Sequence, residues 1–239
     1  MKKGFLFLCL ISIAACTNLD WIGSGKQTTR EFTLKPFQLI EFNDNFDIEL
    51  FQDTASNTLV FEGGENLLQN IDIEQTDEKV TVTNHVKMRF STLNEKIKLR
   101  LPSGKMTQLR IFAPITLTCK DTISKNAFFL HIEVDIAKVN LLMNCDYLYF
   151  VAGNTSGNYA ICGKTMDFRI LTKGTAIVDA SQFKSNNIYV ESNSTGNCFV
   201  NPLSYLSATI KQSGNIYYTG QPDSISLMNI NASGKLIKL

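Results

Sequence analysis

The fold is decided by a short polar corner, Ser194-Thr195-Gly196-Asn197-Cys198, which recurs as Gln212-Ser213-Gly214-Asn215-Ile216. Each corner stands between two short apolar runs. Similar corners occur at Thr155-Ser156-Gly157-Asn158-Tyr159, Thr172-Lys173-Gly174-Thr175-Ala176 and Ala232-Ser233-Gly234-Lys235-Leu236. Divided at Phe150, Phe168, Asn187, Leu206 and Ile225, the first four units hold 18, 19, 19 and 19 residues by subtraction. A short, regular repeat with one glycine per unit predicts a β-solenoid with one unit per coil.

The corner residues suggest how the chain turns between strands. Glycine adopts a positive φ without steric cost, and asparagine tolerates that conformation better than most residues. We therefore expect the corner glycines to bend the backbone at each coil. Successive coils are then expected to stack through parallel strand hydrogen bonds about 4.8 Å apart.

Residues 32–111 carry a related signal with a shorter period. Apolar and polar residues alternate in runs such as Phe46-Asp47-Ile48-Glu49-Leu50 and Ile97-Lys98-Leu99-Arg100-Leu101. Period two is typical of strands with one buried face, and no long stretch keeps a helical period. We predict an all-β, parallel β-helix-like solenoid with Gly/Asn corners and nearly no helix. Residues 30–149 form its N-terminal β part and residues 150–239 form its repeating C-terminal coils.

Composition excludes several classes of protein. The chain has 239 residues and a formal net charge of +1, so no general electrostatic attraction to nucleic acid is expected. Hydrophobic residues make up 44%, which is enough to build a core. Only 2 His are present, and this disfavours a histidine-based metal site. We expect no metal, no cofactor and no catalytic residue.

The N-terminus carries a predicted targeting signal. Lys2 and Lys3 precede an apolar run that is too short to span a bilayer and ends in Ile13-Ala14-Ala15-Cys16. Residues 1–15 are predicted to be a signal peptide, and residues 13–16 resemble a bacterial lipobox. Cys16 would then carry the lipid that anchors the protein to a membrane, and residues 16–29 would form the lipidated N-terminus and its spacer. An ordinary secretory signal is the alternative. Thr17 in place of an acidic residue favours the outer membrane.

Four cysteines remain after the leader and the anchor. Cys119, Cys145, Cys162 and Cys198 show no CxxC pairing and lie in strand-like runs. Small buried hydrophobic residues are the favoured interpretation. Cys145 and Cys162 could lie on adjacent coils, whereas Cys162 and Cys198 would be two coils apart, beyond disulfide reach.

Several segments, taken in order, resemble a known family. They are the lipobox, Arg30-Glu31-Phe32, Phe37-Gln38-Leu39-Ile40, Phe46-Asp47-Ile48-Glu49-Leu50, Val60-Phe61-Glu62-Gly63-Gly64-Glu65-Asn66-Leu67-Leu68 and Ser213-Gly214-Asn215-Ile216-Tyr217-Tyr218-Thr219-Gly220-Gln221-Pro222. From about Phe32 onward the chain resembles the autotransporter-adhesin head GIN domain family, common among envelope lipoproteins of Bacteroidota. The resemblance implies a right-handed parallel β-helix-like fold and supplies no catalytic residues. The chain lacks a Gly-Ser corner at Ala113-Pro114-Ile115 and within Phe128–Leu142, so irregular coils are expected there.

Two groups of residues are candidates for ligand binding. Lys96, Lys98 and Arg100 alternate with apolar residues and so project from one strand face, where they could bind an acidic glycan or the phosphate of lipopolysaccharide. Lys87, Arg89 and Arg110 could join them. Tyrosines recur about once per coil, and Tyr217 with Tyr218 could stack on sugar rings. A solvated strand face and a packing ladder are the respective alternatives.

The leading functional hypothesis is a non-enzymatic envelope lipoprotein that adheres to or binds a glycan or protein. A lyase-like enzyme that acts on polysaccharides is the alternative, and its nearest candidate residues are Asp167, Arg169, Lys173 and Asp179. A purely structural assembly component is a third possibility.

Overall fold

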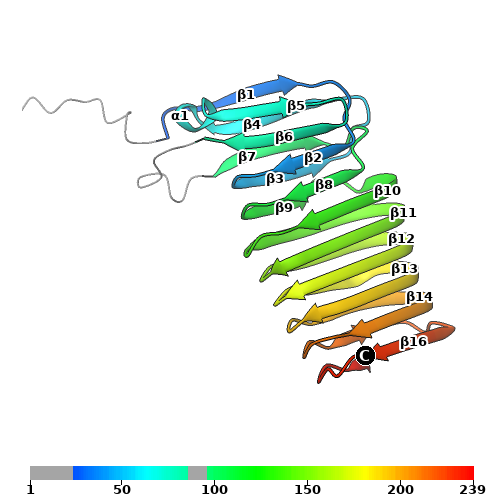
Figure 1. Ribbon diagram of the computed structural model, residues 1–239. Coiled ribbons are helices and arrows are strands. Elements are labelled where there is room, and N and C mark those ends of the chain that lie inside the picture. The colour runs from blue at the N-terminus through cyan, green and yellow to red at the C-terminus, as the bar shows by residue number, and fades with distance from the viewer. Residues whose placement is uncertain (1–23, 86–95) are drawn as a thin grey trace, which may run out of the picture.

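The computed structural model describes residues 24–85 and 96–239, which form a β-solenoid of about 7 turns (Figure 1). Strands account for 67% of the residues and helix for 2%. Within the described ranges, the one α-helix is the four-residue α1 (Glu65–Leu68). The prediction of an all-β solenoid is therefore confirmed.

The coils that follow the N-terminal region are built from parallel strands. Their bounds are β8 (Gln108–Ile111), β9 (Ile115–Cys119), β10 (Ile123–Ile132), β11 (Ala137–Thr155), β12 (Asn158–Gly174), β13 (Ile177–Ser194), β14 (Cys198–Ile210), β15 (Ile216–Tyr218), β16 (Ser224–Asn229) and β17 (Leu236–Lys238). The long strands run round more than one side of a coil before they end (Figure 1).

The register shows how the coils stack. Leu148 of β11 pairs with Phe168 of β12, and Phe168 pairs in turn with Ile188 of β13, so these two coils are equal in length. The next coil is slightly shorter, since Asn187 of β13 pairs with Tyr205 of β14. The predicted stacking of one repeat unit per coil is confirmed.

Inward side chains of successive coils form continuous apolar ladders. One ladder consists of side chains that pair from strand to strand and are fully buried: Phe128, Leu148, Phe168, Ile188 and Leu206. Full burial of a Leu, Ile or Phe side chain stabilises the folded state by roughly 1.5–3 kcal/mol relative to exposure. Because each coil contributes the same positions, stability is distributed along the axis.

Only some of the corner glycines have the positive φ that the sequence predicts. Gly174 has a φ of +80°, and Asn154 and Asn231 also have a positive φ, as expected of bends. Gly196 and Gly214, however, do not have a positive φ. A Cβ on Gly196 would lie 2.1 Å from the carbonyl oxygen of Ala176 on the preceding coil. At that corner glycine is required because the coils approach closely.

The N-terminal region departs from a simple succession of coils. Its strands are β1 (Gln27–Thr33), β2 (Leu39–Phe42), β3 (Phe46–Phe51), β4 (Thr58–Gly64), β5 (Ile71–Gln75), β6 (Lys79–Asn84) and β7 (Ile97–Pro102). Strand β2 lies between β6 and β8, and β3 lies between β7 and β9. The coil formed by β6 and β7 therefore stacks outside the earlier coil of β2 and β3.

Antiparallel pairs complete this end of the molecule. Strand β1 pairs with β4, β4 with β7 and β5 with β6, all antiparallel. Together with α1 they cover the first coils (Figure 1). Period-two alternation marks strands but not their direction, so the sequence pattern did not predict this cap.

The expected irregular coils are regular. Strand β10 pairs with both β8 and β11 without a register shift, and β9 begins at Ile115. Residues 133–136 form the corner there without a glycine. The irregularities lie elsewhere, for example between Asp179 and Lys184.

Candidate functional site

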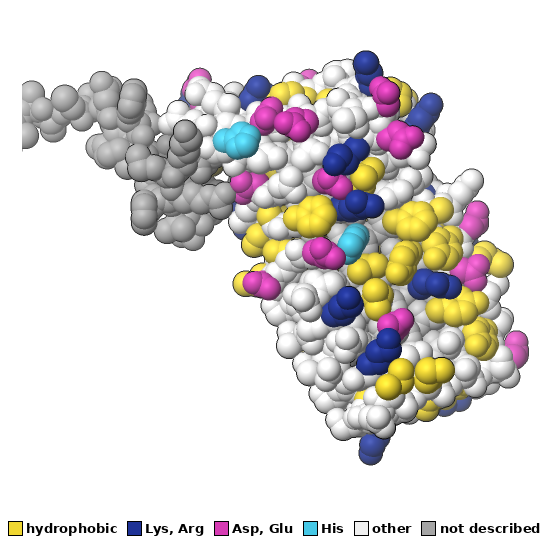
Figure 2. Space-filling view, viewed as in Figure 1, with side chains coloured by type: hydrophobic (Ala, Val, Ile, Leu, Met, Phe, Trp, Pro, Cys, Tyr) yellow, Lys and Arg dark blue, Asp and Glu magenta, His cyan; other side chains and the backbone are white. Residues whose placement is uncertain are grey.

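The outer wall of the solenoid carries aligned rows of side chains. Because alternate residues of a strand face outward, register partners on successive coils form a column on the surface. Figure 2 shows hydrophobic side chains gathered over the middle coils, with charged side chains among them. The column along β8 and β10–β14 contains Gln108, Phe129, Tyr149, Arg169, Tyr189 and Ser207.

The aromatic rings of this wall form two clusters. In the first, the ring of Phe129 lies 6.3 Å from that of Tyr149 and 5.8 Å from that of Tyr147, between centroids. In the second, the rings of Tyr189 and Tyr205 lie 5.7 Å apart. Every aromatic side chain of the two clusters stays half-exposed, so each cluster presents a ready apolar surface.

A cation lies between the two aromatic clusters. The Arg169 guanidinium is 5.4 Å from the centre of the Tyr189 ring. In the register of the coils, Arg169 stands between Tyr149 and Tyr189. The wall therefore combines aromatic faces with a positive charge.

The two tyrosines singled out from the sequence face different environments. Tyr217 of β15 stacks on Phe199 of β14, with ring centroids 4.9 Å apart and an interplanar angle of 11°. The Asn215 side-chain amide donates a hydrogen bond of 3.1 Å to the Tyr217 hydroxyl. Tyr218 pairs with the buried Val200 and packs against the core. Tyr217 is thus available to a ligand together with Phe199, whereas Tyr218 contributes to packing.

The basic strand face is matched by acidic side chains. Lys96 Nζ lies 3.1 Å from Asp47 Oδ1 of β3, and Arg100 Nε lies 3.8 Å from Glu49 Oε1. Lys98 of β7 pairs with Asp47 on one side and Glu62 on the other. Acids on both neighbouring strands reduce the positive potential of this face, so its attraction for an anion is weakened. Lys87 and Arg89 lie outside the described residues.

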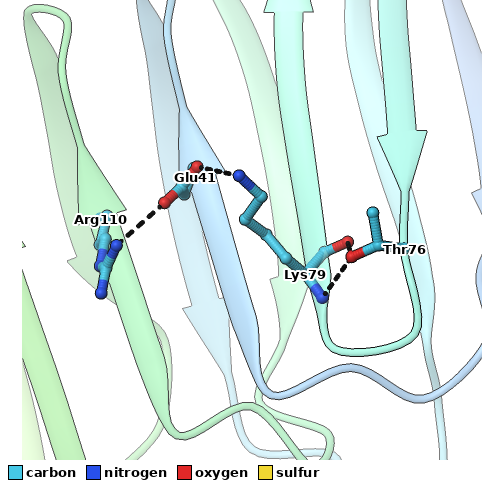
Figure 3. Close-up of polar contacts among 4 residues, drawn as sticks. All are labelled: Glu41, Thr76, Lys79 and Arg110. Carbon is cyan, nitrogen blue, oxygen red and sulfur yellow. Dashed lines mark hydrogen bonds and ion pairs between the residues drawn. The ribbon is translucent and has the colours of Figure 1, made fainter.

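Arg110 belongs to a separate ion-pair cluster (Figure 3). Its Nη1 lies 3.2 Å from Glu41 Oε1, and Lys79 Nζ lies 3.0 Å from Glu41 Oε2. The backbone N–H of Lys79 donates to the Thr76 hydroxyl at 3.2 Å. Glu41 is 12% exposed and joins β2 to both neighbouring strands, which indicates a structural role.

Of the residues considered for lyase chemistry, Asp167 and Arg169 lie two positions apart on β12, whereas Lys173 lies at the end of that strand and Asp179 on β13. Asp167 Oδ1 accepts a hydrogen bond from the Asn187 side chain at 2.9 Å, and Asp179 Oδ1 accepts from the Ser181 backbone and hydroxyl. Arg169 lies over Tyr189, whereas Lys173 lines a separate hollow at a corner. In the part of the chain that the structure describes, no three His, Cys, Asp or Glu side chains are grouped as metal ligands.

The four cysteines are free thiols in the structure. Cys145 pairs with Thr165 and Cys162 with Leu142, so the two lie on adjacent coils but out of register. Burial raises the pKa of Cys119 to about 11 and that of Cys198 to about 12. Burial also raises the pKa of Cys145. Since the thiolate is the nucleophile, these three are poor candidates for nucleophilic catalysis.

Sequence reasoning missed a groove of about 630 Å³ on the side of the coils between β10 and β14. Its lining residues are Ser124, Lys125, Asn126, Asn144, Cys145, Asp146, Lys164, Thr165, Met166, Lys184, Asn186 and Leu203. Lys164 and Lys184 are register partners on adjacent coils. The two lysines are one coil length apart in the sequence, and this spacing is the signal from which their proximity could have been predicted.

The candidate anchor lies outside the structural description. Cys16 and the predicted signal peptide belong to residues 1–23, so lipidation stays a prediction from the sequence. No helix in the described ranges has the length and apolarity needed to cross a membrane.

Comparison with known families and structures gives consistent results. The family model described as "Putative auto-transporter adhesin, head GIN domain" matches residues 36–222. A protein of Bacteroides fragilis described as a putative adhesin shares the fold at a TM-score of 0.83 and 18% identity. That alignment covers 90% of this chain and 97% of the other.

Two structures from Parabacteroides are also similar in fold. One, from P. distasonis and described as a putative lipid binding protein, has a TM-score of 0.68 at 18% identity, and the alignment covers 91% of this chain and 98% of the other. A putative adhesin of P. merdae has a TM-score of 0.62 at 18% identity, with the same coverage. No curated protein matches the chain.

Proposed function

The chain belongs to the auto-transporter adhesin head GIN domain family, and from that premise we propose that it is a non-enzymatic lipoprotein of the bacterial cell envelope. In this proposal the lipid on Cys16 holds the protein on the outer membrane. The solenoid then presents its outer wall to a glycan or protein ligand.

The observation that carries the proposal is the half-exposed aromatic wall. Phe129, Tyr147 and Tyr149 form one cluster, and Tyr189 and Tyr205 form another, with Arg169 over Tyr189. Aromatic faces stack on sugar rings and also anchor protein interfaces. Their repetition from coil to coil suits a long ligand better than a small one.

Two further observations support a binding role over catalysis. Asp167 and Arg169 are two residues apart on β12, but Lys173 lines a separate hollow, Asp179 lies on β13, and neighbouring side chains already engage Asp167 and Asp179. The half-buried Cys119 and the buried Cys198 hold their thiols in the protonated state, because burial raises the pKa of both. General acid–base chemistry needs the participating groups within hydrogen-bond reach of one substrate.

A binding screen tests the proposal. The purified chain would be applied to arrays of glycans and envelope or host proteins, beside the variant Tyr149→Ala/Tyr189→Ala. Loss of two stacking contacts of roughly 0.5–1.5 kcal/mol each weakens binding about 5- to 150-fold. Phe51→Ala, which removes an outward half-exposed ring from β3, is the matched control and is expected to bind normally.

The screen has a clear contrary outcome. Turnover of a polysaccharide by the purified chain, with no binding to any arrayed glycan or protein, would contradict the proposal. For the anchor, Cys16→Ser is expected to move the protein from the membrane fraction to the soluble fraction of its host. Unchanged membrane association of Cys16→Ser would remove the anchoring claim.

A further inference from the structure

The groove between β10 and β14 is built by the turning of the chain around each coil. One wall consists of Ser124, Asn144, Lys164 and Lys184, which pair from strand to strand. The other consists of Asn126, Asp146, Met166, Asn186 and Leu203. Four coil spacings of about 4.8 Å give the groove a length of roughly 19 Å along the axis. It is therefore shaped for an extended ligand.

The floor is formed by side chains that turn toward the interior. Cys145 Sγ lies 3.5 Å from Thr165 Oγ1, and the Thr165 hydroxyl donates to the Asp167 carbonyl at 3.2 Å. At one end, Lys125 Nζ donates to the Ser103 carbonyl at 3.0 Å and also to that of Gly104. The polar side chains of the floor thus already have hydrogen-bond partners within the protein. The two walls of the groove provide the groups that can contact a ligand.

The charge of the lining is positive. Lys125, Lys164 and Lys184 against Asp146 give 3 − 1 = +2, whereas the whole chain carries a formal charge of +1. Lys96, Lys79 and Lys211 each form an ion pair on the outer surface. Lys164 and Lys184 form no ion pair with any residue in the described ranges.

The two lysines are also held close together. As register partners on adjacent parallel strands, their backbones lie about 4.8 Å apart, and like charges that face each other across strands are destabilising. An anion between them would relieve this repulsion. Both side chains are exposed and flexible enough to follow anionic groups along a chain.

The remaining wall residues indicate which anionic ligand fits. The amides of Asn126, Asn144 and Asn186 both donate and accept hydrogen bonds, as hydroxyl groups require. Met166 and Leu203 are 51% and 45% exposed and offer apolar surface beside the amides. Hydroxyls, apolar C–H faces and repeated anionic groups occur together in an acidic polysaccharide.

We propose that this groove binds an acidic polysaccharide, whose chain lies along the solenoid axis with its carboxylate or sulfate groups at Lys164 and Lys184. The inference rests on the proposed binding function and specifies its ligand class. The asparagine amides bind the hydroxyls, and Met166 with Leu203 contacts the apolar face of the sugar rings.

The test measures binding of the purified chain to polygalacturonate and dextran sulfate by calorimetry, with methyl-esterified polygalacturonate and dextran as uncharged counterparts. At least one anionic polymer is expected to bind, and its uncharged counterpart to bind at least about tenfold more weakly. Raising the salt concentration from about 0.05 to about 0.5 M is expected to weaken the binding about tenfold or more.

Charge reversal locates the site. Lys164→Glu/Lys184→Glu is expected to lower the affinity at least about tenfold. Lys235→Glu/Lys238→Glu makes the same change of net charge at the C-terminal edge and is expected to have less than about a threefold effect. Circular dichroism and thermal unfolding of both variants would verify that they fold.

Several results would overturn the inference. These are the absence of binding to both anionic polymers, equal binding of the uncharged polymers, and equal loss in the two charge-reversal variants. Binding of polyglutamate as tight as that of the polysaccharides would also overturn it, since the ligand class would then be wrong. Failure here leaves the array result with Tyr149→Ala/Tyr189→Ala unaffected, so the two proposals fail separately.

Discussion

At the scale of the residue, glycine sets the distance between coils at the corners. Ideal Cβ atoms on Gly196, Gly214 and Gly234 would each lie within 2.3 Å of a backbone carbonyl oxygen of the preceding coil. Each overlap falls on main chain, which can move only if the coils separate. Alanine at these corners is therefore opposed by packing, although no positive φ is involved.

Gly196→Ala is expected to destabilise the protein by about 1–3 kcal/mol, because overpacking against rigid neighbours has a cost of that order. Gly153→Ala is the control, since its Cβ would meet the flexible Glu133 side chain at 3.2 Å. Urea unfolding of both variants measures the difference. Equal midpoints for the two would contradict the close-approach explanation.

The buried thiols predict how stability depends on alkaline pH. The ordinary thiol pKa of 9.0 is raised by burial to about 12 for Cys198 and to about 11 for Cys119. The unfolded chain loses these protons at lower pH than the folded one, so stability is fully present below pH 9.0 and falls between 9.0 and about 12. Thermal unfolding of Cys198→Ala, compared with Cys162→Ala, is expected to show a flatter decline over this range. A decline as steep as that of the parent chain would show that Cys198 does not contribute.

At the scale of the element, parallel register is the property that brings functional side chains together. Tyr149 and Tyr189 lie in one column because the coils between them are equal in length, and the same step aligns Lys164 with Lys184. Both the aromatic clusters and the groove therefore depend on the register of β11–β13.

Engineered disulfides test this register directly. Glu191 of β13 pairs with Thr209 of β14, whereas Leu171 pairs with Glu191 and so lies two coils from Thr209. Glu191→Cys/Thr209→Cys is expected to form a disulfide, because parallel neighbours lie about 4.8 Å apart. Leu171→Cys/Thr209→Cys, at about 9.6 Å, is expected to stay reduced. Peptide mapping without reductant distinguishes the two, and the reverse pattern would contradict the register.

The repeating coils could be predicted from the sequence, but the cap and the groove could not. Gly196 and Gly214 recur with the period of the fold, and this recurrence is a local signal. The pairing of β2 with both β6 and β8 depends on a chain reversal that no local pattern encodes. The pairing of Lys96 with Asp47 depends in turn on that arrangement, so sequence analysis identified the cations without their acidic partners.

At the scale of the whole molecule, the two ends of the solenoid are unequal. The N-terminal end is covered by antiparallel strands and α1 (Figure 1). In the last coil, Ile225 and Leu227 continue the inward ladders of Leu206 and Ala208, yet they are 42% and 51% exposed. Burial of apolar side chains in that coil therefore contributes less to the stability of the folded state.

Hydrogen exchange should reflect this inequality. Amides of β16 are expected to exchange faster than those of β12, because β16 has a coil on one side and a smaller apolar contact. Peptide-resolved exchange of the purified chain measures both strands in one experiment. Slower exchange in β16 than in β12 would indicate that something covers the last coil.

The central claim is that the outer wall of the middle coils binds the ligand. Hydroxyl-radical footprinting of side chains, with and without the tightest glycan or protein from the array, tests it most directly. The account predicts protection of Tyr149 and Tyr189, with Phe51 of β3 unchanged. Protection of Phe51 and the N-terminal cap, with Tyr149 and Tyr189 unchanged, would contradict it.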